Sequence, residues 1–103
     1  MKLFRRVTTE EANRILTVGF EDKAGTYLTN QKRTGVFVST RPLDCNEGVP
    51  LAAIVLLEIR LAMLEADISD YEWTEEGKSY REWQLPAAML NSYATVRVVS
   101  TTI

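Results

Sequence analysis

The stretch GVFVSTRPLDCNEG, residues 35–48, decides the fold. It begins with β-branched and aromatic residues at 36–38 and then changes abruptly to hydroxyl side chains, a proline and a polar loop. Such a change is typical of a buried strand that ends at a cleft, because connecting segments lie at the surface and present functional side chains there. We therefore expect a strand that opens at Gly35 and presents Ser39 and Thr40 at its end.

The residues before this stretch predict a strand followed by a helix. Residues 3–7 alternate between apolar and basic side chains, which suits a short strand whose Arg6 faces away from the core. Thr8 and Glu11 then form a capping-box pattern, in which the hydroxyl caps the helix and the carboxylate stands three residues later. We expect a helix over residues 9–18, ended by the next glycine.

The rest of the chain predicts short strands separated by turns. The expected elements are a long, partly ordered loop over 20–33 with a short strand at 26–28, a strand over 54–61, a helix over about 63–71, strands over 72–74 and 80–85, a short helix over 86–90 and a last strand over 94–101. Residues 51–64 are ambiguous, because alanines and leucines favour a helix while the alternation at 57–61 favours a half-buried strand. The sum is an α+β domain with five to six strands.

Length and composition indicate one ordinary globular domain over residues 1–103. Hydrophobic residues make up 46% of the chain and charged residues 25%, which is the range of folded proteins rather than disordered segments. The longest apolar stretch, 49–57, is far shorter than the ~20 residues that a membrane helix requires. The first residues lack the apolar region of a secretion signal. We therefore expect a cytoplasmic location and no membrane contact.

Two classes of chemistry are excluded by residue counts. Cys45 is the only cysteine and the chain has no histidine, so disulfides, zinc-finger spacings and Ser-His or Cys-His nucleophiles are absent. The polar run at 44–47 lacks the spacing of a calcium loop, and we interpret it as a loop without a metal. The net charge of −2, with both signs interspersed, predicts no broad nucleic-acid-binding surface.

Three short motifs around Arg6, Ser39 and Glu82 resemble the ADP-ribosyltransferase superfamily. Its members share a strand with Arg or His, a second strand that ends in a Ser-Thr motif or a related position, and a third strand that carries a glutamate. The matching stretches are LFRRVTT at 3–9, FVST at 37–40 and EWQLP at 82–86, the last being similar to the DarT-type DNA ADP-ribosyltransferase toxins. Tyr80 stands where the arginine-modifying branch has Glu or Gln, which argues against modification of protein arginine.

The resemblance implies a small split sheet, mixed or antiparallel, with one main N-terminal helix and one or two short helices. It also implies NAD as substrate, with an acceptor that is protein, DNA, RNA or water. In this interpretation the catalytic residues are Glu82, Ser39 and Arg6. Cleavage of the nicotinamide N-glycosidic bond builds positive charge on the ribose, which a fixed carboxylate such as Glu82 stabilises. Arg6 offers a planar fork of donors to phosphate or ribose oxygens, and Ser39 orients the carboxylate or the ribose.

Further NAD contacts are assigned on the same basis. Thr40 follows Ser39 in the Ser-Thr motif and is a second hydroxyl candidate. Tyr27 and Phe37 are aromatic candidates for stacking on the nicotinamide ring. A related variant, an RNA 2′-phosphotransferase-like activity, ranks lower because it needs several basic groups around a phosphate and the sequence shows few.

A non-catalytic interaction or regulatory module is the alternative from a different class. In that case Arg6 is a solvated strand residue, with Arg5 competing for any special role, and Glu82 pairs across strands with a Lys or Arg. Catalysis requires the three motif residues to line one pocket, whereas an interaction module predicts exposed patches. The candidate patches are Trp73 and Trp83, which we otherwise interpret as packing residues, and the acidic residues between 65 and 76, which we otherwise interpret as a solvated face.

Overall fold

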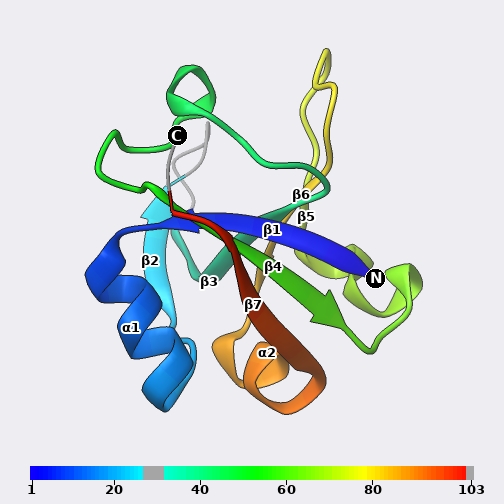
Figure 1. Cartoon of the computed structure of the whole chain (residues 1–103). Helices are drawn as coiled ribbons and strands as arrows, with labels where there is room; N and C mark the ends of the chain where they lie inside the picture. The colour runs from blue at the N-terminus through cyan, green and yellow to red at the C-terminus, as the bar shows by residue number, and fades with distance from the viewer. Residues whose placement is uncertain (27–31, 102–103) are drawn as a thin grey trace.

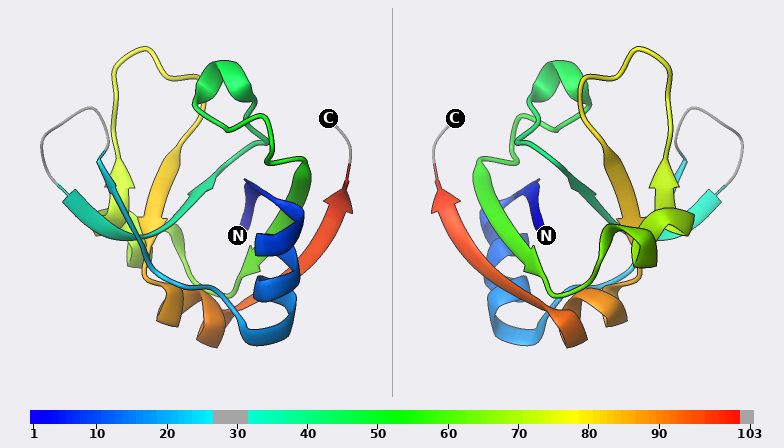
Figure 2. Two further views of the ribbon diagram at one scale, coloured as in Figure 1. Left: turned by 90° about the vertical axis from the view of Figure 1, so that its left-hand side faces the viewer. Right: turned by 90° about the vertical axis from the view of Figure 1, so that its right-hand side faces the viewer.

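The computed structural model describes residues 1–26 and 32–101, and it places two α-helices on one face of a curved antiparallel sheet (Figures 1 and 2). In chain order the elements are β1 (Lys2–Val7), α1 (Thr9–Val18), β2 (Lys23–Thr26), β3 (Lys32–Ser39), the 3-10 helix η1 (Cys45–Glu47), β4 (Val55–Leu61), the 3-10 helix η2 (Glu65–Tyr71), β5 (Glu72–Trp73), β6 (Glu82–Leu85), α2 (Ala87–Tyr93) and β7 (Ala94–Ser100). The predicted α+β class is confirmed. Within the described ranges, no helix is long and apolar enough to cross a membrane.

The sheet is divided into two halves. The strand order is β5-β6-β3-β1-β4-β7, and β2 pairs with the other part of β3. β1 pairs with β4 over six positions, from Lys2 to Val7, but with β3 at a single position, where Phe4 lies opposite Ser39. The sheet is therefore split between β1 and β3, with β1, β4 and β7 on one side and the remaining strands on the other.

The two faces of the sheet differ in chemistry. The face toward the helices is apolar, and Ile15 of α1 and Leu90 of α2 belong to the same buried cluster as Leu57 and Trp83. The other face carries the buried polar residues of the described chain, Ser39, Glu58, Glu82 and Gln84. Their common face follows from the register, in which Phe4 pairs with Ser39 and Glu58, Ser39 pairs with Glu82, and Phe37 pairs with Gln84. Polar side chains thus gather on the face that the helices do not cover.

Local signals explain α1, whose predicted bounds are confirmed. The hydroxyl of Thr8 accepts a hydrogen bond from the Glu11 amide at 3.1 Å, which satisfies one of the free N–H groups of the first turn. Gly19 ends the helix with a φ of 99°, a conformation that costs little without a side chain. A second glycine, Gly35, has a φ of 149°, and a Cβ there would lie 2.9 Å from the carbonyl oxygen of Leu85. β3 and β6 therefore approach each other closely only because this residue is glycine.

The main error of the sequence prediction is the loop expected over residues 20–33. Lys23–Thr26 pairs with Lys32–Gly35 instead, so β3 begins three residues before Gly35 and the described sheet has seven strands rather than five or six. Tyr27 lies outside the described residues. The helix expected at 63–71 is a 3-10 helix over Glu65–Tyr71, and Pro86 caps α2 rather than opening it. The strand predicted over 54–61 is confirmed to within one residue as β4.

Candidate functional site

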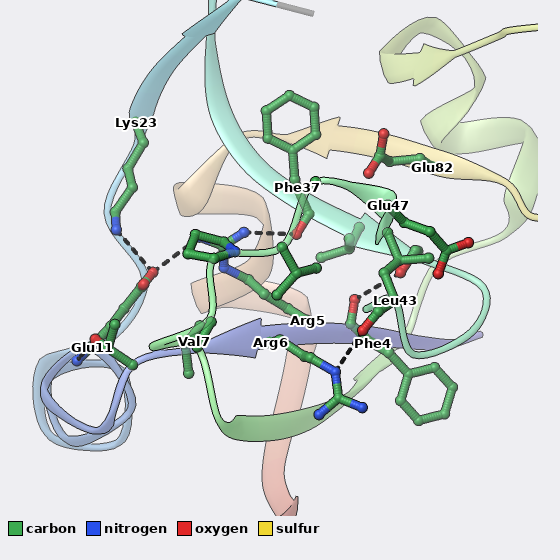
Figure 3. Close-up of a pocket in the computed structure, with 17 residues that line it drawn as sticks. Phe4, Arg5, Arg6, Val7, Glu11, Lys23, Phe37, Leu43, Glu47 and Glu82 are labelled. Atoms are coloured by element: carbon green, nitrogen blue, oxygen red, sulfur yellow. Dashed lines mark hydrogen bonds and ion pairs between the residues drawn. The ribbon is translucent and has the colours of Figure 1, made fainter. Parts of the chain in front are cut away.

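A cavity of about 410 Å³ opens where β1 and β3 separate (Figure 3). This volume falls in the range of roughly 300–1,000 Å³ that is typical of small-molecule sites. Its lining comes from both halves of the sheet, from α1 and β2, and from the loop after β3. Its polar and aromatic lining residues are Phe4, Arg5, Arg6, Thr8, Glu11, Lys23, Phe37, Ser39, Glu47 and Glu82. Because β1 and β3 share one register position, the split leaves space that a continuous ladder would fill.

Four of the predicted site residues line this cavity, and one does not. Arg6 from β1, Phe37 and Ser39 from β3, and Glu82 from β6 all contribute to its wall. Thr40 lies outside the lining and is exposed, so its role in binding NAD stays a prediction that the cavity does not support. Its amide donates to the carbonyl of Arg81 at 3.0 Å and its hydroxyl accepts from the Arg81 amide at 3.0 Å. Thr40 therefore extends the pairing of β3 with the chain before β6.

The hydroxyl of Ser39 joins the two halves of the sheet. Ser39 is 3% exposed, and its Oγ donates to the carbonyl of Arg41 at 2.8 Å and lies 3.4 Å from the carbonyl oxygen of Phe4. The hydroxyl proton is thus directed to backbone oxygens of this chain. The oxygen lone pairs are what Ser39 offers to a ligand, since a hydroxyl has one proton to donate and two lone pairs.

Arg5 is the residue that the sequence interpretation underrated. Its Nη1 donates to the carbonyl of Phe37 at 3.1 Å, and its Nη2 donates to the carboxylate of Glu11 at 3.0 Å. The guanidinium therefore connects β1 to β3 at the split, as Figure 3 shows. Its Nε is buried and has no hydrogen-bond partner among the described residues. The available signal was the alternation of residues 3–7, which puts this arginine on the core-facing side, where a charge is unusual.

Arg6 lies on the other side of β1. Its Nε donates to the carbonyl of Leu43 at 2.5 Å, so it holds the loop after β3 against the sheet. Figure 3 places its guanidinium well away from Glu82. Its Nη1 is buried and makes no hydrogen bond within the part of the chain that the structure describes. Arg5 and Arg6 both line the cavity, and each has one buried N–H group that makes no hydrogen bond to the described residues.

Glu82 is a buried carboxylate with a basic neighbour. It is 7% exposed, and its Oε1 lies 3.4 Å from Nζ of Lys78. Lys78 precedes β6 and also lies 3.8 Å from Glu75 and 5.1 Å from the ring centre of Tyr80. Glu82 therefore lies in the cavity wall and also forms an ion pair, which is the structural role that we considered for it. Its partner, Lys78, lies in the segment before β6 and not on a neighbouring strand.

The two tryptophans are buried and do not form an exposed protein-binding patch. Trp73 is 7% exposed and Trp83 is 0% exposed, so both are packing residues. The indole N–H of Trp73 donates to the side chain of Gln84 at 3.1 Å. In the described ranges no group of three or more cysteine, aspartate or glutamate side chains has the arrangement of a metal site. The three motif residues line one pocket, and most acidic residues between 65 and 76 are exposed, so the geometry meets one condition of each alternative.

Glu11 connects the two basic residues on the α1 side of the cavity. Its carboxylate lies 3.0 Å from Nη2 of Arg5 and 3.0 Å from Nζ of Lys23. Burial alone would raise the pKa of Glu11, but the charges and hydrogen bonds of Arg5 and Lys23 outweigh it and lower the pKa below its usual value. A lowered pKa in the folded state means that the unfolded state binds the proton more tightly. The resulting stabilisation is present above an unfolded pKa of about 4.3 and is lost as pH falls through the folded pKa.

Replacing Glu11→Gln is therefore expected to destabilise the protein in a pH-dependent way. At pH 7 the free energy of unfolding should fall by about 1–2 kcal/mol, because charge-assisted hydrogen bonds to two cations are lost. Near pH 3, below the unfolded pKa, the difference from the unmodified protein should be smaller, since part of the stabilisation from the carboxylate is lost there. Urea unfolding at both pH values measures this, with Glu10→Gln in the same helical turn as control. An equal loss at both pH values would contradict the lowered pKa.

Comparison with known proteins gives no match. No protein-family model, no curated protein and no solved structure matches this chain. The residues of the cavity and their contacts are therefore the basis for a functional proposal.

Proposed function

We propose that this chain is an NAD-dependent ADP-ribosyltransferase or NAD glycohydrolase whose substrate binds in the cavity at the sheet split. One observation supports this above the others. Arg6, Ser39 and Glu82 come from three different strands and from distant parts of the sequence, yet all three line one cavity. Convergence of a cation, a hydroxyl and a buried carboxylate in one pocket is what an active site of this type requires.

The unmet donors of the cavity fit the oxygen-rich part of a dinucleotide. Arg5 Nε and Arg6 Nη1 are buried and lack partners among the described residues. Both atoms are buried, so a ligand oxygen reaches them only when the guanidinium groups turn toward the cavity, and it then satisfies a donor that costs free energy when unmet. Phosphate and ribose hydroxyl oxygens are suitable acceptors, and guanidinium groups bind phosphate with particular geometric specificity.

Glu82 and Phe37 are suited to the reacting end of the substrate. Departure of nicotinamide leaves an oxocarbenium-like ribose, and a carboxylate in a largely buried wall stabilises that charge more than water would. The half-buried ring of Phe37 offers an aromatic face for the departing ring. The bond that breaks is the one between ribose C1′ and the nicotinamide nitrogen. The bond that forms joins C1′ to an acceptor oxygen or nitrogen, which loses its proton.

Binding of NAD tests this proposal before any acceptor is known. Isothermal titration should show saturable binding to the wild-type protein. Arg5→Gln and Arg6→Gln should each weaken it by about 10- to 100-fold, since a hydrogen bond to a charged group contributes about 1.5–3 kcal/mol. Arg14→Gln, on α1 outside the cavity, is the matched control. Absence of binding at millimolar NAD, with circular dichroism showing folded protein, would overturn the proposal.

A non-catalytic NAD-binding module is the second candidate. The ion pair between Glu82 and Lys78 favours it, because a carboxylate held by a lysine is also a common structural arrangement. Chromatography of reaction mixtures separates the two candidates. Release of nicotinamide supports the enzyme, whereas saturable binding without release supports the module.

A further inference from the structure

The half of the sheet formed by β1, β4 and β7 is strongly basic. The basic residues in these three strands are Lys2, Arg5, Arg6, Arg60 and Arg97, and the one acidic residue is Glu58. The acidic residues between 65 and 76 lie in or after η2, toward the opposite edge of the sheet. The chain therefore has a polarised charge distribution, although its net charge is only −2.

A cluster of three cations surrounds Glu58 on the helix-free face. Glu58 is 3% exposed, and its Oε2 accepts from Arg97 Nε at 2.7 Å and lies 2.6 Å from Arg97 Nη2. Its Oε1 lies 3.2 Å from Arg60 Nε and 3.7 Å from Lys2 Nζ. The three basic side chains are 56–66% exposed. One carboxylate cannot neutralise three cations, so this cluster presents a surplus of two positive charges to solvent.

The cluster adjoins an open strand edge. β7 is the last strand in the sheet order and pairs with β4 alone among the described strands. Figure 2 shows β7 at the outer edge of the sheet. Such an edge presents unpaired N–H and C=O groups, and proteins commonly protect it with proline or with outward lysines. β7 contains neither, its Arg97 is bound to Glu58, and Val98 and Val99 are 39% and 46% exposed.

We propose that residues 94–99 of β7 bind an extended acidic peptide as an additional strand of the sheet. Backbone hydrogen bonds along the open edge would hold the peptide, and the alternation of side chains would select it. Peptide residues on the helix-free face would meet the cations around Glu58, which favours glutamate or aspartate there. Residues on the other face would meet Val96 and Val98, which favours apolar side chains. The preferred partner is thus a segment in which acidic and apolar residues alternate.

Charge favours this occupant over a second copy of the chain. A copy that paired through its own β7 would bring its Lys2, Arg60 and Arg97 beside the same residues of the first molecule, and the surplus positive charges would repel each other. An acidic strand instead complements them.

Fluorescence anisotropy with a labelled peptide of alternating glutamate and valine tests this proposal. The peptide should bind the full chain, more weakly as salt is raised, and the matching lysine–valine peptide should not. The double variant Lys2→Gln, Arg60→Gln should weaken binding by about three- to tenfold, since each exposed ion pair contributes 0.2–1 kcal/mol. This variant leaves Arg97 in place for Glu58. Arg14→Gln is again the control.

A glutamate–valine peptide with N-methyl groups along its hydrogen-bonding edge keeps its charge but cannot add a strand. We expect it to lose binding, and we expect hydrogen exchange to slow in β7 when the unmodified peptide binds. Equal binding of the N-methylated or the lysine peptide, protection elsewhere than β7, or no binding at millimolar peptide would overturn the proposal. Sedimentation that shows dimers without peptide, dissociated by Val98→Lys, would instead assign the edge to a second copy and would also overturn it.

Discussion

Replacing Trp83→Ala is expected to lower the free energy of unfolding by about 3–5 kcal/mol, which is the usual cost of removing a fully buried tryptophan. Trp83 is 0% exposed, lies in β6 and belongs to the core cluster under both helices. A domain of this size has a total stability of roughly 5–15 kcal/mol, so the variant should lose a large part of it. Urea unfolding followed by circular dichroism measures the change, because the signal does not depend on the tryptophan that is removed.

The variant Trp83→Phe separates the apolar contribution of the ring from that of its N–H group. The indole N–H of Trp83 is buried and has no acceptor among the described residues, so phenylalanine removes an unmet donor together with part of the ring. Arg81, whose guanidinium lies 4.9 Å from the ring centre, can still stack on phenylalanine. We expect a loss of about 1–2 kcal/mol, well below that of Trp83→Ala. Equal losses would mean that the N–H has a partner that stabilises the fold.

Prediction from the sequence was most accurate for elements whose structure depends on residues close together in the chain. Thr8, Glu11 and Gly19 supply the start and stop signals of α1, so its bounds were predicted correctly. The strand β4 was recognised because alternation outweighed the helical preference of its leucines. The β2–β3 hairpin was missed because the residues of β2 lack an apolar alternation, and its pairing depends on a partner several residues away. No local preference distinguishes such a segment from a loop.

The candidate site shows the same division between local and non-local information. Arg6, Ser39 and Glu82 were identified from short motifs, and each lies at the cavity. Thr40 lies outside the cavity lining, and the motif does not reveal that the residue after Ser39 pairs with Arg81. Arg5 was underrated although strand alternation directs it toward the core, where a charge is unusual. Only the separation of β1 from β3 makes room for its guanidinium there, and that separation is a property of the whole sheet.

Replacing Glu82→Gln is expected to reduce the rate of nicotinamide release by about 10²–10³, the usual effect of removing one electrostatic contact to a transition state. Glutamine keeps the size and one acceptor oxygen of Glu82, so the variant removes the negative charge with little change in shape. In the reaction that we propose, that charge acts mainly on the ribose cation that develops during cleavage, and NAD affinity should therefore change much less than the rate. Initial rates measured by chromatography, together with isothermal titration of the same protein, give both quantities.

Glu75→Gln is the matched control for this experiment. Glu75 also lies near Lys78, at 3.8 Å, but it does not line the cavity. If the ion pairs of Lys78 mattered only for the local structure, both variants would lower activity to a similar extent. If Glu82 acts on the substrate, Glu75→Gln should retain nearly full activity while Glu82→Gln loses it. An unchanged rate in a folded Glu82→Gln protein would exclude this carboxylate from catalysis, and a parallel loss of rate and NAD affinity would make it a binding residue instead.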